Sequence, residues 1–440
     1  MTIRTKLVAA AAAASLIGAA TAAQAATEVQ WWHAMGGKLG EKVNEIAAGF
    51  NASQSDYVVT PVYKGNYTET MTGAIAAFRA KQQPHIVQVF EVGTATMMAA
   101  EGAIYPVYEL MADTGEPFDP SAYLASVAGY YTDTDGNMLS MPFNSSTPVV
   151  YYNKDAFKAA GLDPNSPPKT WPELGEYAKK LQAAGTPCGF TTGWQSWVQI
   201  ENFSAWHNVP IGTEQNGFAG LGTEFTFNSP AHVMHIGQLA EWQKSKIFDY
   251  GGRRSDSAPK FYNAECAMYM NSSAAYAGVK ANVTDFEFGV GMLPYWPDVG
   301  AAPQNSIIGG ATLWVLTGRD AEKYKGVARF FSYLSSAEVQ ADWHQFTGYL
   351  PITNAAYELT KQQGFYDENP GTDTAIMQMT NKAPTANSKG LRFGSFVQTR
   401  DVINEELEAI WNGDKTAQEG LDSAVARGNE LLRKFERAND

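Results

Sequence analysis

The stretch EVQWWHAMGGKLGEKVNEIAAGFNASQSDYVVTPVY, residues 28–63, decides the fold class of this chain. It begins with a short apolar run that is typical of a strand and ends with the β-branched run YVVTPVY, which is typical of another. Between them lies a helical pattern of apolar residues, made by Leu39, Val43, Ile46 and Phe50. Strand, helix and strand in this order favour an α/β fold.

The same alternation continues after this stretch and predicts two α/β lobes. Helix, strand and helix patterns follow at residues 68–82, 84–91 and 94–103, which favours a largely parallel sheet in the first lobe. A second lobe repeats the order from residue 149 onward. The chain has 440 residues, more than the roughly 250–300 at which a single core stops growing. No long linker separates the lobes, so the chain is expected to cross between them more than once.

The N-terminus has the three parts of a secretory signal peptide. Arg4 and Lys6 precede an alanine-rich apolar run, and Ala23-Gln24-Ala25 is a small-x-small cleavage pattern. Removal of residues 1–25 is therefore expected, with a retained membrane anchor as the alternative. No other stretch approaches the ~18 apolar residues of a spanning helix, and no cysteine near the cleavage site offers a lipid anchor. We therefore expect a protein that is free in the periplasm of a Gram-negative cell.

Charge and cysteine content narrow the partners and the compartment. The formal charge is −13, or −15 without Arg4 and Lys6, which argues against nucleic acid or an anionic membrane surface as partner. A small anionic ligand is compatible with it, because local donors outweigh a screened net charge. The two cysteines, Cys188 and Cys266, lie in strand-like runs. They form either one disulfide, which an oxidising compartment permits, or two buried thiols.

Polar residues follow several strand-like runs, where ligands bind in open α/β sheets. These positions are residues 64–67, 91, 144–146, 271–273, 309–310 and 347–349. The run at 305–308 is expected to be a strand that ends at the two glycines. A serine that caps a helix leaves N–H groups where a phosphate can sit, although plain capping is the simpler interpretation of each Asn-Ser-Ser run. Glu91 either accepts bonds from ligand hydroxyls or caps the next helix, since a carboxylate after a buried strand needs a partner.

The sequence lacks the catalytic motifs G-x-S-x-G, H-E-x-x-H, C-x-x-C and Walker A. His232 and His235 lie three residues apart in a helix-like run. No third ligand is suggested beside them, so we expect both to be solvated and predict neither a metal nor a cofactor. A carboxylate pair for glycan cleavage stays an open alternative, although nothing points to a particular pair.

Three tryptophans lie within TTGWQSWVQIENFSAW, residues 191–206, and they are either core or the wall of a binding site. The stretch also carries polar residues that a buried core disfavours, namely Gln195, Gln199, Glu201 and Asn202. Trp206 lies with apolar residues at helical spacing, which favours the core for that ring. Trp194 and Trp197 are i, i+3 neighbours among glutamines, and composition alone leaves them undecided.

Longer runs carry a resemblance to a known family: YKGNYTE, VFEVGTATMMA, PFNSSTPVVYYNKDAFKAAGL, PPKTWPEL, GWQSWVQIENFSAW, PQNSIIGGATLWV, WHQFTGYLPIT and SAVARGNELLRKF. They resemble the extracellular solute-binding proteins of family 1, the periplasmic receptors of ATP-binding-cassette importers, and among them those for sn-glycerol 3-phosphate. The resemblance covers essentially the whole mature chain. It implies the type II fold of periplasmic binding proteins, in which two α/β lobes joined by hinge crossings enclose a ligand cleft. The lobes are expected at residues 26–145 plus about 306–352, and at about 146–305 plus 353–440.

The resemblance also implies which residues bind the ligand. The matching positions are Tyr67, Glu91, Ser146, Trp194, Trp197, Ser272, Gly310, Tyr349 and Arg400. Arg400, Ser272 and the N–H group of Gly310 are expected to hold the phosphate, and Glu91 to accept bonds from the glycerol hydroxyls. Trp194 and Trp197 are expected to pack on the carbon skeleton. The hydroxyls of Tyr67 and Tyr349 are expected to approach from opposite lobes.

The function implied by the resemblance is that of a receptor and not of an enzyme. Such a protein captures sn-glycerol 3-phosphate, closes, and delivers it to the permease subunits of an ABC transporter in the inner membrane. A receptor for glycerophosphodiesters such as glycerophosphocholine is the alternative within the class, because a tryptophan also binds a quaternary ammonium. A sugar receptor, or a periplasmic hydrolase of phosphoesters or glycans, remains as a further alternative. We expect a monomer without a nucleic-acid partner.

Overall fold

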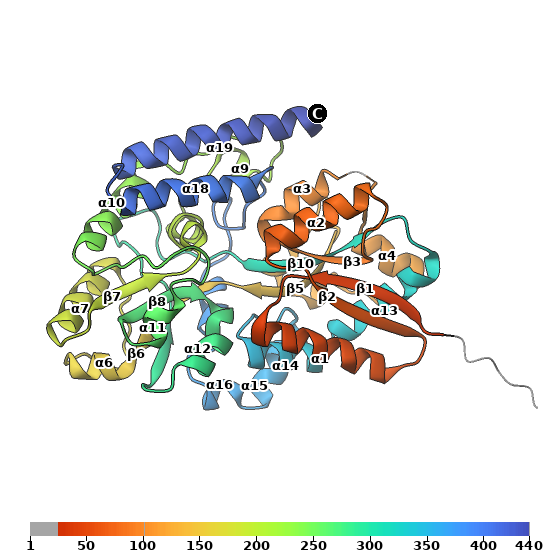
Figure 1. Ribbon diagram of the computed structural model, residues 1–440, viewed down its shortest axis with the longest axis horizontal. Helices are drawn as coiled ribbons and strands as arrows, with labels where there is room; N and C mark the ends of the chain where they lie inside the picture. Colours follow the sequence, from red (N-terminus) through yellow and green to blue (C-terminus); the bar gives the residue numbers. More distant parts are fainter. Residues whose placement is uncertain (1–24, 101, 440) are drawn as a thin grey trace, which may run out of the picture.

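The computed structural model describes residues 25–100 and 102–439 of the chain (Figure 1). The predicted signal peptide, residues 1–25, lies outside this part except for its last residue. Within the described residues, no helix combines the length and the apolar character that a membrane crossing requires.

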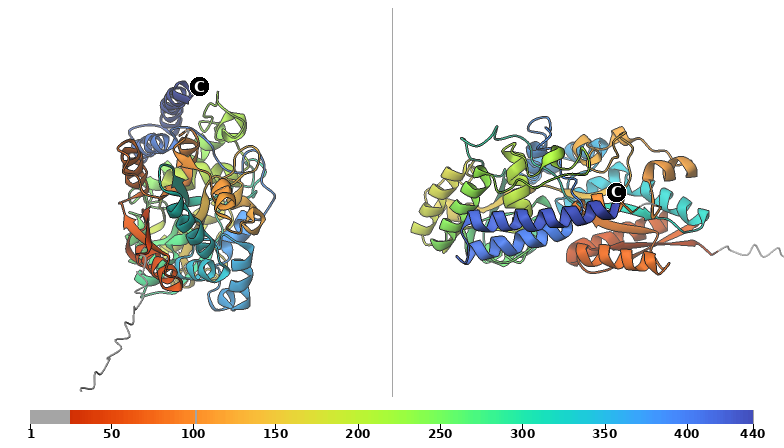
Figure 2. Two further views of the ribbon diagram at one scale, coloured as in Figure 1. Left: turned by 90° about the vertical axis from the view of Figure 1, so that its right-hand side faces the viewer. Right: turned by 90° about the horizontal axis from the view of Figure 1, so that it is seen from above.

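The chain folds around two β-sheets that lie side by side, with helices packed on their faces (Figures 1 and 2). The first sheet has the order β2-β1-β3-β10-β4, with β5 also paired to β10, and the second has the order β7-β8-β6-β9. Strands of the first sheet are β1 Thr27–His33, β2 Tyr57–Tyr63, β3 Ile86–Phe90, β4 Ile104–Tyr105, β5 Met141–Ser146 and β10 Gly309–Leu316. Strands of the second are β6 Pro148–Asn153, β7 Cys188–Thr192, β8 Cys266–Ser272 and β9 Phe288–Gly291.

The helices fall into three groups along the chain. Those before β6 are α1 Gly37–Ser53, α2 Tyr67–Arg79, α3 Thr94–Met98, α4 Val107–Thr114 and α5 Ala125–Ala128. Those between β6 and β10 are α6 Lys154–Ala159, α7 Trp171–Ala183, α8 Phe203–Trp206, α9 Thr213–Asn216, α10 Pro230–Lys244, α11 Ala258–Tyr262 and α12 Tyr276–Asn282. Those after β10 are α13 Ala321–Leu334, α14 Ala337–Thr347, α15 Asn354–Gln362, α16 Phe365–Glu368, α17 Thr374–Met379, α18 Phe396–Trp411 and α19 Ala417–Asn439. Short 3₁₀ turns lie at Glu91–Gly93, Pro120–Ala122 and Ser273–Ala275, and a π-helical segment lies at Trp197–Asn202.

The opening strand-helix-strand unit forms as its sequence pattern predicts. β1 and β2 are parallel neighbours in register from Thr27 opposite Tyr57 to His33 opposite Tyr63. Between them α1 buries the apolar face that its spacing indicated, including Val43, Ile46 and Phe50. The α/β fold with two sheets is therefore confirmed, and it follows from burying one face of each helix against a sheet.

Both sheets are mixed, but in the first sheet β1, β2, β3, β4 and β5 all point in one direction and only β10 is reversed among the described strands. The prediction of a largely parallel first sheet therefore holds apart from β10. β10 runs antiparallel to β3, β4 and β5, and β6 runs antiparallel to β8 and β9. The run at residues 305–308 is not a strand, because β10 begins at Gly309, where a strand was expected to have ended. β10 comes from a segment that returns from the second sheet, and it enters the first sheet in the opposite direction to β3.

Two segments join the sheets and lie against each other. Thr147, between β5 and β6, donates from its hydroxyl to the Ser306 hydroxyl at 2.7 Å and to the Ile307 carbonyl at 3.0 Å. The side chain of Gln378 then bonds the carbonyl of Pro148 at 2.8 Å and Ser306 at 3.0 Å. These bonds tie two crossings into one buried strap. The boundaries of the two lobes along the chain stay a prediction.

The C-terminal helices close one side of the second sheet. α18 and α19 lie side by side, and α10 packs on both (Figures 1 and 2). His232 and His235 on α10 are completely buried, so the expectation that they are solvated is wrong. His232 bonds the hydroxyl of Ser229, the N-cap of the same helix, at 2.7 Å. It also bonds the hydroxyl of Ser204 at 2.8 Å, a partner from another segment that a helical pattern alone does not reveal.

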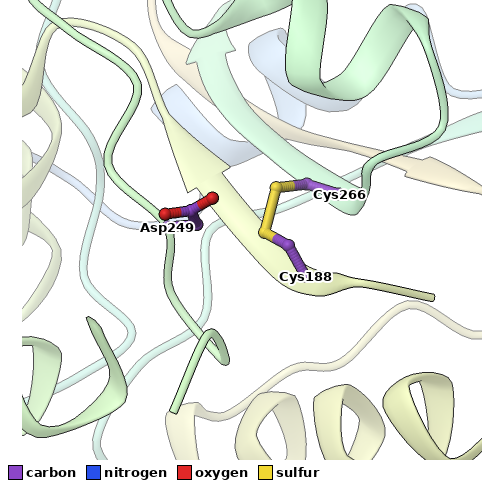
Figure 3. Close-up of side chains that lie close together, drawn as sticks. All are labelled: Cys188, Asp249 and Cys266. Atoms are coloured by element: carbon purple, nitrogen blue, oxygen red, sulfur yellow. A yellow bond between two sulfur atoms is a disulfide. The ribbon is translucent and has the colours of Figure 1, made fainter. Parts of the chain in front are cut away.

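Cys188 and Cys266 form a disulfide, so the sequence alternative of two free thiols is not the one realised (Figure 3). The bond joins the first residues of the parallel neighbours β7 and β8, which pair directly opposite each other. The carboxylate of Asp249 lies beside the two sulfur atoms (Figure 3). This group is not a metal centre, because the sulfurs are bonded to each other and Asp249 is paired with Lys246 and Lys260 at 2.7 Å each.

Candidate ligand-binding site

All nine predicted site residues line one cavity between the two sheets. They come from elements far apart in the chain: Tyr67 from α2, Glu91 from the end of β3, Ser146 from β5, Trp194 and Trp197 from the segment after β7, Ser272 from β8, Gly310 from β10, Tyr349 from the segment after α14, and Arg400 from α18. The cavity has a volume of about 240 Å³, below the roughly 300–1,000 Å³ of sites for drug-sized ligands. Its size favours a small metabolite over an oligosaccharide.

A buried ion cluster forms one end of the cavity wall. The Arg400 guanidinium donates from Nε and Nη2 to the two carboxylate oxygens of Glu201, both at 2.6 Å, and from Nη2 to Glu91 at 2.5 Å. The exposed fractions of the three side chains are 8% for Arg400, 4% for Glu91 and 1% for Glu201. Glu91 directly follows strand β3 of the first sheet, while Arg400 and Glu201 belong to segments packed on the second, so the cluster bridges the two halves of the molecule.

The charges of this cluster do not cancel. Burial raises the pKa of Glu91, and the Arg400 guanidinium opposes this effect. Burial would lower the pKa of Arg400, but the Glu201 and Glu91 carboxylates outweigh it and raise that pKa. With both carboxylates ionised the cluster carries one net negative charge.

The Arg400 guanidinium keeps part of its hydrogen-bonding capacity for a ligand. Three of its five N–H groups are used by the carboxylates, and Nη1 has no partner among the described residues. The fully enclosed side-chain atoms that lack a hydrogen-bond partner among the described residues do not include Nη1. This nitrogen is therefore accessible from the cavity. Together with Glu91 it offers a donor and an acceptor side by side, the pair that a hydroxyl group needs.

A chain of hydrogen bonds positions the two tyrosines. The Tyr67 ring stacks on Phe90 at a centroid distance of 5.3 Å, and its hydroxyl accepts from Asn144 Nδ2 at 2.8 Å. Asn144 Oδ1 in turn accepts from Gln88 at 2.7 Å. The Tyr349 hydroxyl lies beside that of Tyr67, and their expected approach from opposite lobes stays a prediction. Burial raises the pKa of both phenols, which keeps them neutral and able to donate.

The tryptophans divide between wall and core. Trp197 is 4% exposed and packs against Gly309, where a Cβ would lie 2.4 Å from its ring. Trp194 is partly exposed and lines the same cavity. Trp206 is buried, and its indole nitrogen donates to the Leu293 carbonyl at 3.0 Å, which confirms it as core.

Ser272, Ser146 and Gly310 contribute small polar groups to the wall. The Ser272 hydroxyl accepts from the Ala274 N–H at 3.1 Å and keeps its own proton to donate. Ser146 ends β5, and only Thr147 separates it from β6, so no helix is capped there. Gly310 has a φ of +95°, and a Cβ at this position would lie 1.8 Å from the Asn144 carbonyl, so only glycine fits.

Two cavity features were missed by the sequence prediction. Glu201 lies in the π-helical segment and pairs with Arg400. The available signal was its charge, because the other residues of that segment are apolar or carry amides. Arg254 lines the cavity as well, and only the scarcity of arginine in the middle of the chain pointed to it. A larger cavity of about 520 Å³ lies between α3 and α19, and none of the nine predicted residues lines it.

Comparison with known proteins finds a matching family and several similar proteins. Residues 45–374 match the family described as bacterial extracellular solute-binding protein. The sn-glycerol-3-phosphate-binding periplasmic protein UgpB of Yersinia pseudotuberculosis is 56% identical over 418 residues, which is 95% of each chain. UgpB of Salmonella typhimurium is 54% identical over 418 residues, again 95% of each chain.

Solved structures support the fold. UgpB of Mycobacterium tuberculosis in complex with glycerophosphocholine superposes with a TM-score of 0.78 at 21% identity, over 93% of this chain and 99% of that one. Maltose-bound MalE3 of T. maritima gives a TM-score of 0.75 at 18% identity, over 92% and 100%. At these identities the likeness concerns the fold alone.

Proposed function

This chain belongs to the bacterial extracellular solute-binding proteins, and from that premise we propose that it is the periplasmic receptor for sn-glycerol 3-phosphate of an uptake system. Like the members of its family, it is a binding receptor and not an enzyme. The observation that carries the proposal is the gathering of nine residues, which match a glycerol-phosphate receptor, around one small cavity between two sheets.

The two kinds of polar group in the cavity suit the two ends of this ligand. We assign the glycerol hydroxyls to the cluster end, where Glu91 accepts and Arg400 Nη1 donates. This assignment replaces the phosphate role expected for Arg400, because two carboxylates already share its charge. The phosphate then takes the donors of Ser272, Ser146 and the Gly310 N–H group, while Trp194 and Trp197 cover the carbon skeleton.

The magnitudes are sufficient for useful affinity. A micromolar dissociation constant requires about −8 kcal/mol. A few hydrogen bonds to charged groups contribute about 1.5–3 kcal/mol each, from which the costs of association are subtracted. The enclosed position of the site strengthens each such bond, because little water competes for it.

Binding from both halves supports a mechanism of closure. Ligand contacts that come from both sheets favour the conformation in which the halves are close together. The closed form would then be the one presented to the permease subunits of an ABC transporter, which we propose as the partner in the inner membrane.

Glycerophosphocholine is the second candidate ligand. It is favoured by the partly exposed Trp194 ring at the cavity, since an aromatic face attracts a quaternary ammonium. The M. tuberculosis relative of the same name was solved with this diester, although the low identity limits that likeness to the fold.

Isothermal titration calorimetry of the mature protein tests the proposal. The panel is sn-glycerol 3-phosphate, glycerophosphocholine, glycerol and maltose, and we expect the first to bind most tightly and the last two to give no heat. Absence of binding by sn-glycerol 3-phosphate would refute the main proposal, and tighter binding of the diester would replace it by the second. Recovery of each ligand unchanged after long incubation checks that no turnover occurs.

A further inference from the structure

We propose that Arg254 is the cation that reads the phosphate group and that it sets a preference for phosphomonoesters over phosphodiesters. This inference rests on the proposed function, because it concerns how the same cavity recognises its ligand. Arg254 lies between α10 and α11 and lines the cavity together with Ser255.

The charge of the cavity requires a second cation. Glu91, Arg400 and Arg254 line it, and Glu201 lies directly behind Arg400. With both carboxylates ionised, the charge of this group is −1 without Arg254 and zero with it. A phosphomonoester carries about −1.5 to −2 near neutral pH. It would otherwise enter a site of its own sign, where few waters screen the repulsion.

Arg254 is not committed to any carboxylate of the described residues. Its neighbour Arg253 is held by Glu408 through two bonds of 2.7 Å, whereas Arg254 forms no ion pair in that part of the chain. The charges of both arginines act to lower the pKa of Asp401, but Asp401 forms no ion pair with either of them. Arg254 is exposed although it lines the cavity, which places it at the mouth where a phosphate would point.

The backbone of Arg254 is held in place by the cavity wall. Its φ of +53° lies in the left-handed region, which a residue other than glycine rarely adopts unless its surroundings fix it. The Arg254 carbonyl accepts from the Trp194 N–H at 2.6 Å. Ser255 accepts from the Asn271 side chain at 3.2 Å, and Asn271 accepts from the N–H of Ser272 at 2.7 Å. The wall therefore connects Arg254, through its neighbour Ser255 and through Asn271, to Ser272, the serine assigned to the phosphate.

The preference for monoesters follows from the chemistry of the two groups. A monoester presents three terminal oxygens to a planar guanidinium, which binds such oxygens in pairs. A diester has one terminal oxygen fewer and a smaller charge, and its substituent occupies the mouth. Arg254 thus contributes more to binding of the monoester.

The test compares the variants Arg254→Gln and Arg253→Gln by calorimetry with sn-glycerol 3-phosphate and glycerophosphocholine. We expect Arg254→Gln to weaken binding of sn-glycerol 3-phosphate about 10- to 100-fold, the range of one or two charge-assisted bonds, and to weaken binding of the diester less than fivefold. Arg253→Gln, the matched control outside the cavity, should stay within threefold of wild type. Added salt should weaken wild-type binding of the monoester more than it weakens that of Arg254→Gln.

The outcomes separate this inference from the proposed function. If wild type binds sn-glycerol 3-phosphate and Arg254→Gln binds it equally well, the inference is overturned and the receptor function stands. Equal losses for both ligands overturn the preference for monoesters. If wild type does not bind sn-glycerol 3-phosphate at all, the proposed function fails and this inference fails with it. Thermal unfolding verifies that Arg254→Gln is folded, as expected for an exposed side chain without an ion pair.

Discussion

Replacing Arg400 by methionine should destabilise the protein strongly, because it removes the cation between two buried carboxylates. Glu91 and Glu201 are 4% and 1% exposed, and they would lose three N–H groups that donate at 2.5–2.6 Å. Breaking a buried ion pair by removing one partner costs about 3–5 kcal/mol. A folded protein is stable by only about 5–15 kcal/mol, so the expected loss is a large part of the total.

The loss should depend on pH in a defined direction. Burial raises the pKa of Glu91, and the Arg400 guanidinium opposes that shift, so the variant has a still higher Glu91 pKa. A carboxyl whose folded pKa is raised destabilises the fold fully above that pKa, and this cost shrinks as the pH falls from the folded pKa towards the lower pKa of the unfolded chain. The deficit of the variant relative to wild type should therefore be larger at pH 7.5 than at pH 5.

Equilibrium unfolding in urea, followed by tryptophan fluorescence at both pH values, measures this effect. The uncharged triple variant with Glu91→Gln, Glu201→Gln and Arg400→Met should recover more than half of the loss, because no isolated charge stays buried. An unfolding midpoint for Arg400→Met equal to that of wild type at both pH values would refute the reasoning. Binding data on any Arg400 variant need this measurement beside them, since weaker binding can reflect a disturbed fold.

Three further predictions concern acid stability, the disulfide and the ligand hydroxyls. Burial lowers the pKa of His232 from 6.5 to about 3, so the stability that neutral His232 gives is lost as the pH falls below 6.5, by about 2 kcal/mol at pH 5. The free energy of unfolding of His232→Asn, measured in urea, should fall by about 2 kcal/mol less than that of wild type between pH 7 and pH 5. An equal fall in the two proteins would contradict the burial. The double variant Cys188→Ser and Cys266→Ser opens a loop spanning 78 residues and should lose about 4 kcal/mol of unfolding free energy. Its affinity for sn-glycerol 3-phosphate should change less than threefold, because the bond lies at the end of β8 away from Ser272; a larger change would show coupling to the site. Glu91→Gln should weaken the binding of sn-glycerol 3-phosphate about tenfold or more in calorimetry. Unchanged affinity would show that Glu91 does not bind the glycerol hydroxyls.

The fold could be predicted from local patterns wherever one element decides its own burial. The face of α1 formed by Val43, Ile46 and Phe50 is an example, because helical spacing alone determines which residues turn inward. The direction of β10 could not be predicted in this way. It depends on the chain returning from the second sheet along residues 292–308, and periodicity says nothing about where such a segment leads.

The site shows the same division. Its nine residues were placed by their motifs, and the structure brings them to one cavity. The partners of those residues were not foreseen, because Glu201 meets Arg400 across 199 positions of the sequence. His232 and His235 were misjudged for a related reason, since the hydroxyl and amide groups that satisfy them lie on other segments. Polar pairing of this kind is a tertiary property that no spacing rule within one helix contains.

The disulfide carries a consequence for biogenesis. With two cysteines in the whole chain, one pairing exists, and the protein needs an oxidant after export but no isomerase to correct a wrong bond. The two sulfurs belong to directly opposed residues of neighbouring strands, so they meet once β7 has paired with β8. The disulfide therefore forms after the second sheet has assembled, and it then stabilises that sheet. A precursor that stays in the reducing cytoplasm lacks this lock, which leaves it easier to unfold and keeps it competent for translocation.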